Sequence, residues 1–284
     1  PAWSFTPEME EEVVKKSTAM ALALGTKGLT NIQWLFYNGQ LNIIEANPRS
    51  SRTVPYLSKV TGVPMVELAT RAMLGEKVRD MGFGTGLFKE RNYYAAKVPV
   101  FSFEKLMDVD THLGPEMKST GEVLGIAPTR QEAIYKGMLA AGWKMIHPSE
   151  KKDASILFSV RQSDLPELPA LAKKFYDMGF KLYATSGNAS TIERSGMKVT
   201  YVNKVHENYN DNVMTLLESG KIDYVLSTSA KGRDPVAESV KLRRLAVEHD
   251  IDCFTSMDTA NAMADCLASK FNVNNLCLVD INHM

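Results

Sequence analysis

Short apolar runs alternate with helical segments through the second half of the chain. The apolar runs cover residues 154–160, 181–184, 198–201, 224–227 and 252–255, and helical periodicity lies near 165–178, 188–195, 211–219, 235–248 and 258–268. Strands that are buried on both faces and joined through helices pair in parallel. The pattern therefore predicts an α/β fold class, with a doubly wound parallel sheet in this half.

The first half mixes helices with antiparallel strands. Two apolar runs, 31–37 and 41–46, flank Asn38 and Gly39, which is the strongest short signal for a β-hairpin. Residues 112–125 read as loops and short extended pieces. A short strand is expected at 95–101, and helices are expected at 7–24, 63–74 and 129–141, the last opening on a capping box at Thr129 and Glu132.

A polar stretch separates the two halves. Residues 143–153 contain Pro148 and a run of charged residues at 150–153, which is typical of a connection between domains. We therefore expect one domain over residues 1–147, mixed α+β, and a second over residues 148–284, which holds the parallel sheet.

The composition supports two folded domains and excludes some partners. The 284 residues are 44% apolar, enough for a core in each domain. Lysine plus arginine and aspartate plus glutamate both number 33, so no overall positive field would attract nucleic acid or anionic lipid, and no run is apolar enough for a membrane span. The three cysteines lack the spacing of a zinc site or a disulfide framework, which favours the reduced cytoplasm.

Residues that can bind a metal ion and phosphate lie at the end of the predicted hairpin. Glu45 and Asn47 are two residues apart on a strand, so their side chains share one face. A carboxylate with amide oxygens suits Mg²⁺ that is bound together with phosphates. Arg49 and Arg52 follow and could bind phosphate oxygens in bidentate fashion. The alternative is a hairpin whose polar side faces water.

The position of Gln33 depends on the hairpin connection. A strict two-residue turn pairs Gln33 with Ile44 and sends its side chain to the opposite face. A three-residue connection, from Asn38 to Gln40, pairs Gln33 with Glu45 and adds a third polar side chain to the face. The metal-binding interpretation requires the second arrangement.

These segments resemble, in order, the second synthetase unit of the carbamoyl phosphate synthetase large subunit. The resemblance rests on NIQ at 31–33, EANPRSSRT at 45–53, VPYLSKVTGVPM at 54–65 and LGPEMKSTGEV at 113–123. It implies that residues 1–147 are the carboxyl-terminal part of an ATP-grasp domain. It also implies that Gln33, Glu45 and Asn47 bind Mg²⁺ or Mn²⁺ and organise the ATP phosphates, while Arg49 and Arg52 contact the transferred phosphoryl group or the carbamate.

The resemblance implies a reaction and partners. Members of the family make carbamoyl phosphate from bicarbonate, glutamine-derived ammonia and ATP, for pyrimidine or arginine biosynthesis. The glycine-rich loop, nucleotide-binding lysine and adenine pocket of the family precede this part, so we expect the chain alone to be inactive. The chain starts at Pro1 without Met, and we expect missing sequence upstream. The implied partners are the remainder of the large subunit and a glutaminase small subunit, and we expect a homo-oligomer.

A second group of polar residues follows strands of the parallel sheet. LYATSGNAST at 182–191 joins a predicted strand to a predicted helix, and a helix amino terminus with small hydroxyl side chains can bind an anion. Ordinary helix capping is the alternative. Segments 203–205 and 227–231 also follow strands, at the sheet edge where ligands of such folds bind.

This half is similar to the methylglyoxal-synthase-like allosteric domain of the same family. The similarity rests on LYATSG at 182–187, NKVHE at 203–207, GKIDYVLST at 220–228 and ESVKLRRLAVEHDID at 238–252. It implies a nucleotide effector such as UMP or IMP, or N-acetylglutamate in some members. The implied contacts are Thr185, Ser186, Asn188, Lys204, Thr228 and Ser229.

Two alternative functions remain open at this point. The chain could act as an effector-binding regulatory module only. It could also be a methylglyoxal-synthase-like lyase, which needs an aspartate base. The Gly-Asp pair of that enzyme aligns with Tyr209 and Asn210, and an amide cannot abstract a proton at neutral pH. Asp211, one residue on, would serve only after a register shift.

Overall fold

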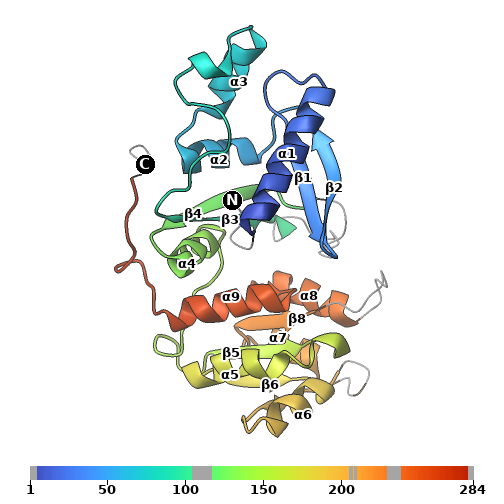
Figure 1. The fold of residues 1–284 in the computed structure, drawn as a ribbon. Coiled ribbons are helices and arrows are strands. Elements are labelled where there is room, and N and C mark those ends of the chain that lie inside the picture. The colour runs from blue at the N-terminus through green and yellow to red at the C-terminus, as the bar shows by residue number, and fades with distance from the viewer. Residues whose placement is uncertain (1–4, 104–116, 205–206, 208–209, 229–237, 281–284) are drawn as a thin grey trace. The chain divides into compact units, whose positions relative to one another are not determined.

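The computed structural model describes residues 5–103, 117–204, 207, 210–228 and 238–280. The chain forms two compact units, Pro1–Tyr93 together with Leu278–Met284, and Tyr94–Cys277. Figure 1 shows the elements of each unit. The unit boundary precedes Tyr94, whereas the sequence places a domain boundary between residues 147 and 148. The domain boundary between residues 147 and 148 remains a prediction about the two evolutionary domains.

The first unit begins with a helix packed on a hairpin. Helix α1 (Pro7–Ala23) starts after Thr6, whose hydroxyl accepts a hydrogen bond from the Met9 N–H at 3.4 Å. Strands β1 (Asn31–Tyr37) and β2 (Gln40–Asn47) pair antiparallel. The Trp34 indole N–H donates to Ser17 Oγ on α1 at 3.0 Å. The hairpin therefore packs one face on α1, and its other face carries Gln33 and Glu45.

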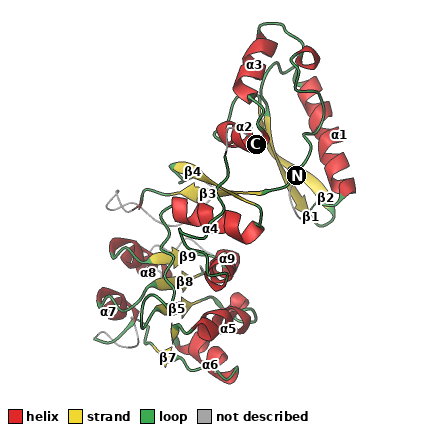
Figure 2. Ribbon diagram, turned by 90° about the vertical axis from the view of Figure 1, so that its left-hand side faces the viewer, coloured by secondary structure: helices red, strands yellow, loops and turns green. Residues whose placement is uncertain are grey.

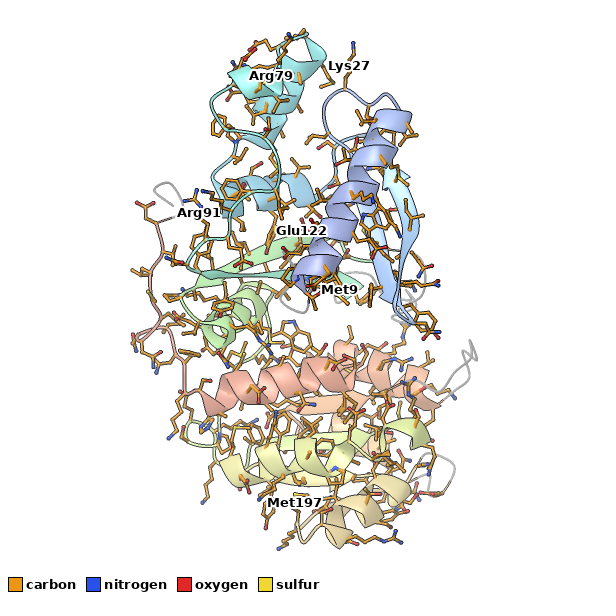
Figure 3. The ribbon with its side chains drawn as sticks, viewed as in Figure 1. Met9, Lys27, Arg79, Arg91, Glu122 and Met197 are labelled. Carbon is orange, nitrogen blue, oxygen red and sulfur yellow. The ribbon has the colours of Figure 1, made fainter. Side chains whose placement is uncertain are left out.

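Two short α-helices and a 3-10 helix, η1 (Val78–Asp80), follow the hairpin in the first unit. Helix α2 (Thr53–Thr61) ends at Gly62, which adopts φ 71°, and α3 (Met65–Met73) follows. The sequence pattern predicts one helix over 63–74 and misses α2, which contains Pro55 in its first turn. Arg91, labelled in Figure 3, donates to the Thr61 carbonyl at 3.3 Å and lies 5.2 Å from the centre of the Phe88 ring.

The second unit opens with two strands and a helix in unusually close contact. Strands β3 (Tyr94–Val100) and β4 (Gly121–Ala127) pair antiparallel, and α4 (Arg130–Ala140) packs against them. Gly125 on β4 faces α4 so closely that a Cβ there would lie 1.9 Å from the Ala133 carbonyl oxygen. Strand β4 occupies part of a segment expected to be mostly irregular.

Only one of the two hydrogen bonds of the capping box predicted at the start of α4 forms. The Thr129 hydroxyl accepts from the Glu132 N–H at 3.3 Å, as expected. The Glu132 carboxylate instead forms an ion pair with Lys136 at 3.3 Å and accepts from the Cys277 N–H at 2.5 Å. Its position is therefore set by a residue far along the chain.

The rest of the second unit confirms the predicted doubly wound sheet. The strand order is β7-β6-β5-β8-β9, with parallel pairing throughout. The strands are β5 (Ser155–Ser159), β6 (Lys181–Ala184), β7 (Thr200–Tyr201), β8 (Tyr224–Ser227) and β9 (Asp252–Phe254). The helices are α5 (Leu168–Met178), α6 (Ser186–Arg194), α7 (Val213–Glu218), α8 (Glu238–Glu248) and α9 (Met257–Ala268).

Alternate residues of each central strand enter different cores. Ile156 and Phe158 of β5 pack in one cluster with residues of α5, α6 and α9, whereas Leu157 packs in another with residues of α7 and α8. Figure 2 shows these two sets of helices on opposite faces of the sheet. Side-chain alternation along a strand explains why its run is continuously apolar. Among the described residues, no helix is long and apolar enough to cross a bilayer.

Candidate metal-binding face and effector-binding edge

The hairpin brings Gln33 and Glu45 together, by a different route from the predicted one. Its turn has two residues, since Tyr37 pairs with Gln40, and Asn38 and Gly39 adopt φ 49° and 73°. Such a turn alone would pair Gln33 with Ile44. Instead, the register shifts after Trp34, which pairs with Ile43, so that Gln33 lies opposite Glu45. The three-residue connection is therefore wrong, and a bulge that accommodates Ile44 supplies the extra residue.

The bulge aligns a polar face on the hairpin. Gln33 and Glu45 lie opposite each other, and Asn31 lies opposite Asn47, so all four side chains point to one face. The Asn47 amide donates to Glu45 Oε1 at 2.8 Å, which orients the Asn47 amide oxygen and Glu45 Oε2 as further oxygen donors. Sequence reasoning missed Asn31, although its two-residue spacing from Gln33 was a usable signal.

The two arginines follow directly after this face. Arg49 is exposed, and its guanidinium donates to the Ser50 carbonyl at 3.0 Å. Arg52 occupies the N-cap position of α2 and is also exposed. The four residues 45, 47, 49 and 52 thus lie on one short stretch of chain, from the end of β2 to the start of α2. Among the described residues, no cluster of three or more His, Cys, Asp or Glu could hold a metal ion, so a cation here would need amide oxygens.

The second candidate site lies at the carboxyl ends of the parallel strands. The chain runs from β5 outward to β7 on one side and then returns to β8 and β9 on the other side of β5. Ligands of doubly wound folds bind at such a switch point. We define the switch-point edge as residues 160–164 after β5, 185–188 after β6, 203–204 after β7 and 227–228 at the end of β8.

Two predicted effector contacts are used inside the protein at this edge. Asn188 is buried, accepts from the Val160 N–H at 2.8 Å and donates to the Val160 carbonyl at 3.2 Å, so it joins α6 to the end of β5. The buried Thr228 hydroxyl accepts from the Arg161 N–H at 3.0 Å and joins β8 to the same strand end. Both side chains therefore shape the edge.

The other predicted contacts are placed differently. Thr185 occupies the N-cap of α6, but its side chain makes no cap hydrogen bond, so the capping alternative does not describe it. Ser186 opens α6 and Lys204 follows β7, and both are half-buried. Ser229 lies outside the described residues. Ser186 at the start of α6 and Lys204 after the neighbouring strand β7 thus both lie at the switch-point edge, where a helix amino terminus can bind an anion.

A buried hydroxyl at the end of β8 was not among the predicted contacts. Ser227 is fully buried, and its Oγ has no hydrogen-bond partner within the described part of the chain. Buried polar atoms without a partner are rare and point to strain, a ligand or water. The sequence signal that could have identified Ser227 was its position directly before the predicted contact Thr228, at the end of a strand. The other such atom is Glu122 Oε1 on β4, labelled in Figure 3, whose second oxygen lies 3.3 Å from Lys97 Nζ.

Two of the three cysteines have thiols of low reactivity. Cys253, Cys266 and Cys277 form no disulfide bond within the part of the chain that the structure describes. Burial raises the pKa of Cys253 and of Cys266 to about 12, so both thiols stay protonated at neutral pH. Nucleophilic chemistry by these two thiols is therefore not expected.

Comparisons with known proteins divide the chain in the same order as the two sites. Residues 1–81 match the family "Carbamoyl-phosphate synthase L chain, ATP binding domain", and residues 167–255 match the "MGS-like domain". The first match contains the polar face of the hairpin, and the second contains most of the switch-point edge.

Relatives match over nearly the whole chain. The carbamoyl phosphate synthase large chain from Lachnoclostridium phytofermentans is 44% identical over 99% of this chain. The one from Clostridium beijerinckii is 40% identical over 96% of this chain. The chain spans only 26% and 25% of those two relatives. A crystal structure of methylglyoxal synthase from Elizabethkingia anophelis is 17% identical over 39% of this chain and 76% of that one, with a TM-score of 0.33.

The aligned segments are the carboxyl-terminal portion of these relatives, which joins the end of the ATP-binding domain to the MGS-like domain. The sequence resemblance is thereby confirmed. The chain thus combines a segment similar to the carbamoyl-phosphate synthase ATP-binding domain with an MGS-like domain, and it aligns with the carboxyl-terminal portion of carbamoyl phosphate synthase large chains.

Proposed function

We propose that this chain supplies part of the site at which a full-length large subunit phosphorylates carbamate, together with a domain that binds an effector. The observation that carries the first part is the bulged hairpin, which places Gln33, Glu45 and Asn47 on one face. The face lies next to Arg49 and Arg52. The relatives' name and the match to an ATP-binding domain support a ligase that uses ATP.

The oxygen donors of this face fit a hard divalent cation. Glu45 contributes a carboxylate, and Gln33 and Asn47 contribute amide oxygens, a set that suits Mg²⁺ or Mn²⁺ when phosphate oxygens complete the coordination. The ion would neutralise charge on the ATP phosphates. In this proposal, Glu45 and Asn47 hold their oxygens in place through their mutual hydrogen bond, so little reorganisation is needed during reaction.

In this proposal the two arginines bind the phosphoryl group that is transferred or its acceptor. A carbamate oxygen attacks the terminal phosphorus of ATP, the bond to the bridging oxygen breaks, and ADP leaves. Arg49 and Arg52 can bind the equatorial oxygens of the phosphoryl group or the carboxylate of carbamate, because a guanidinium pairs with either in bidentate fashion. Their role is to orient the acceptor and stabilise the transferred charge.

The chain by itself is expected to make no carbamoyl phosphate. It spans about a quarter of the relatives' length, and in the first unit large apolar side chains such as Tyr37, Ile44 and Leu74 are 63%, 61% and 81% exposed. We propose that this surface is covered in the full-length subunit. Incubation of the purified chain with ATP, Mg²⁺, bicarbonate and ammonia should give no product above background, with the full-length subunit as control. Synthesis by the chain alone would contradict the proposal.

The second unit is proposed to bind a nucleotide such as UMP or IMP, or N-acetylglutamate, at the switch-point edge. Support comes from the position of the amino terminus of α6 and of Lys204 at this edge, and from Ser227 Oγ, which has no hydrogen-bond partner among the described residues. A ligand at 100 times its Kd stabilises the native state by about 2.7 kcal/mol, so the midpoint of thermal unfolding should rise by several degrees.

The experiment is a thermal shift titration with each ligand. Lys204→Gln should reduce the stabilisation by anionic ligands, and Lys173→Gln, an exposed residue on α5, is the matched control. If no ligand stabilises the chain, the effector proposal is wrong.

A lyase function is the second candidate. Asp211 is exposed, and its carbonyl accepts from the Asn203 amide at 2.9 Å. Methylglyoxal formation that is lost in Asp211→Asn would favour it. The remaining expectations, namely a homo-oligomer, a glutaminase small subunit and the cytoplasm as location, stay proposals based on the family.

A further inference from the structure

Tyr224 is the first residue of β8, and its hydroxyl lies inside the second unit. The side chain is fully buried, and the hydroxyl donates to the Lys144 carbonyl at 2.5 Å and accepts from the Ile146 N–H at 2.8 Å. Burial raises the pKa of the Tyr224 hydroxyl, so the group stays protonated and keeps both roles at neutral pH. One side chain of the sheet thus holds two backbone groups that precede β5.

We call residues 143–146 the connecting segment, because they follow α4 and lead toward β5. The segment is also bonded to β9, the strand next to β8. The Lys144 N–H donates to Asp252 Oδ2 at 2.7 Å, and the Trp143 ring stacks on the Phe254 ring at 5.1 Å. The N–H and the carbonyl of Lys144 are therefore held by the first residues of two neighbouring strands.

The opposite end of β8 lies at the switch-point edge. The strand has four residues, so its two ends are about 10 Å apart. At that end Ser227 Oγ is buried and has no hydrogen-bond partner among the described residues, which points to a ligand or water there. Strand β8 pairs with β5 on one side and β9 on the other, so it is a rigid element that joins the edge to the connecting segment.

A row of aromatic rings accompanies the hydrogen bonds. The Tyr224 ring lies 6.0 Å from the Phe180 ring and 5.7 Å from the Phe254 ring, which in turn stacks on Trp143. Because protein interiors are close-packed, a small displacement of one ring is passed to its neighbours. The hydroxyl is the part of this connection that a substitution can remove while the ring stays in place.

We propose that Tyr224 transmits effector binding from the switch-point edge to the connecting segment, and through it to α4. Tyr224 is a positioning residue, because its hydroxyl bonds to the connecting segment at the end of β8 remote from the edge. The inference rests on the proposed effector function and adds a means of regulation to it. Ligand binding at one end of β8 changes the position of the backbone that is bonded at the other end.

The first test follows backbone amide signals of the 284-residue chain by NMR during titration with UMP. UMP should shift the signals of Ser186 and Gly187 at the edge and also those of the connecting segment. In Tyr224→Phe the edge signals should still shift, whereas those of the connecting segment should no longer respond. If UMP shifts the edge signals of the unaltered chain but leaves the connecting segment unchanged, the inference is wrong, whether or not the variant folds.

The second test measures ATP formation from ADP and carbamoyl phosphate by the full-length large subunit, with and without UMP. Coupled sites alter each other at least about fivefold, so UMP should change the rate by that much in the unaltered subunit and by less than about twofold in Tyr224→Phe. The affinity for UMP should stay within about threefold, because a positioning residue leaves most of the binding contacts in place.

Phe175→Leu separates transmission from a loss of stability. Phe175 is fully buried in the same core, and its ring packs against those of Phe158 and Phe180. This variant should lower the free energy of unfolding but keep the response of the rate to UMP. Loss of the response in both variants would show that destabilisation alone abolishes it, and would overturn the role of Tyr224.

The remaining outcomes distinguish this inference from the effector proposal. A full response of Tyr224→Phe to UMP, or UMP binding by the unaltered subunit without any change in rate, would overturn the inference and leave the effector proposal intact. Failure of the unaltered chain to bind UMP would instead count against UMP as the effector, and the inference would fall with it.

Discussion

Replacing Gly125 with alanine is expected to destabilise the second unit by about 3 kcal/mol, near the upper end for added volume in a packed core. The new Cβ would lie 1.9 Å from the Ala133 carbonyl oxygen and 2.5 Å from the Gly137 nitrogen. Both are backbone atoms of α4, so no side-chain rotation relieves the clash, and the helix must move away from β4. Urea denaturation followed by circular dichroism measures the change in the free energy of unfolding.

Two further glycine variants make this prediction specific. A Cβ at Gly121, on the same strand, would meet only Val100 Cβ at 4.0 Å, so Gly121→Ala should change stability by less than about 0.5 kcal/mol. A Cβ at Gly137 would lie 2.7 Å from Val98 Cγ2, so shortening Val98 to alanine should relieve part of the cost of Gly137→Ala. Equal stabilities of Gly125→Ala and Gly121→Ala would show that α4 does not approach β4 this closely.

Replacing Glu45 with glutamine in the full-length large subunit is expected to slow carbamoyl phosphate formation by about 10²- to 10³-fold. The substitution keeps the size of the side chain and an acceptor for the Asn47 amide but removes the carboxylate charge from the polar face. Losing one preorganised electrostatic contact at a reacting centre costs about this much. The rate of ATP formation from ADP and carbamoyl phosphate measures the same step in reverse.

The matched control lies on the same strand. Asn42 is exposed and donates to the Gln40 carbonyl at 3.1 Å, so Asn42→Ala should leave the rate within about twofold of the unaltered enzyme. A higher Mg²⁺ or Mn²⁺ concentration should partly restore Glu45→Gln if Glu45 binds the cation. Full activity of the Glu45→Gln enzyme would show that the polar face takes no part in the reaction.

The sequence determines the elements whose signals are local. The alternation of apolar runs with helical periodicity predicts the five parallel strands of the sheet, because each strand is buried on both faces and each crossover helix has one apolar side. Asn38 and Gly39 predict the hairpin turn, since both residues tolerate positive φ. The motif at 45–53 identifies the family, as the relatives confirm.

Other features depend on contacts that sequence spacing does not encode. The sequence leaves the register of Gln33 open between a two-residue and a three-residue turn. The structure has the two-residue turn and places an extra residue at Ile44, next to the pair of Trp34 and Ile43, where Trp34 also bonds to Ser17 of α1. Strand β4 looked irregular because of its glycines. One of them, Gly125, faces α4 so closely that no Cβ would fit, which only the packed structure reveals.

The same division applies to the effector-binding edge. Small polar residues after each strand could be selected from the sequence, since ligands bind at the carboxyl ends of parallel strands. Which of them remain available was decided by tertiary hydrogen bonds. Asn188 of α6 and Thr228 after β8 both bond to the end of β5, Ser227 Oγ has no partner within the described residues, and Asp164 bonds to Arg161. The sequence by itself thus determines the family, the sheet and the residue types at each site. The geometry of each site comes from pairing between residues that are distant in the chain. The reason is that the hydrogen-bond donors a side chain can offer depend on which residues pack beside it.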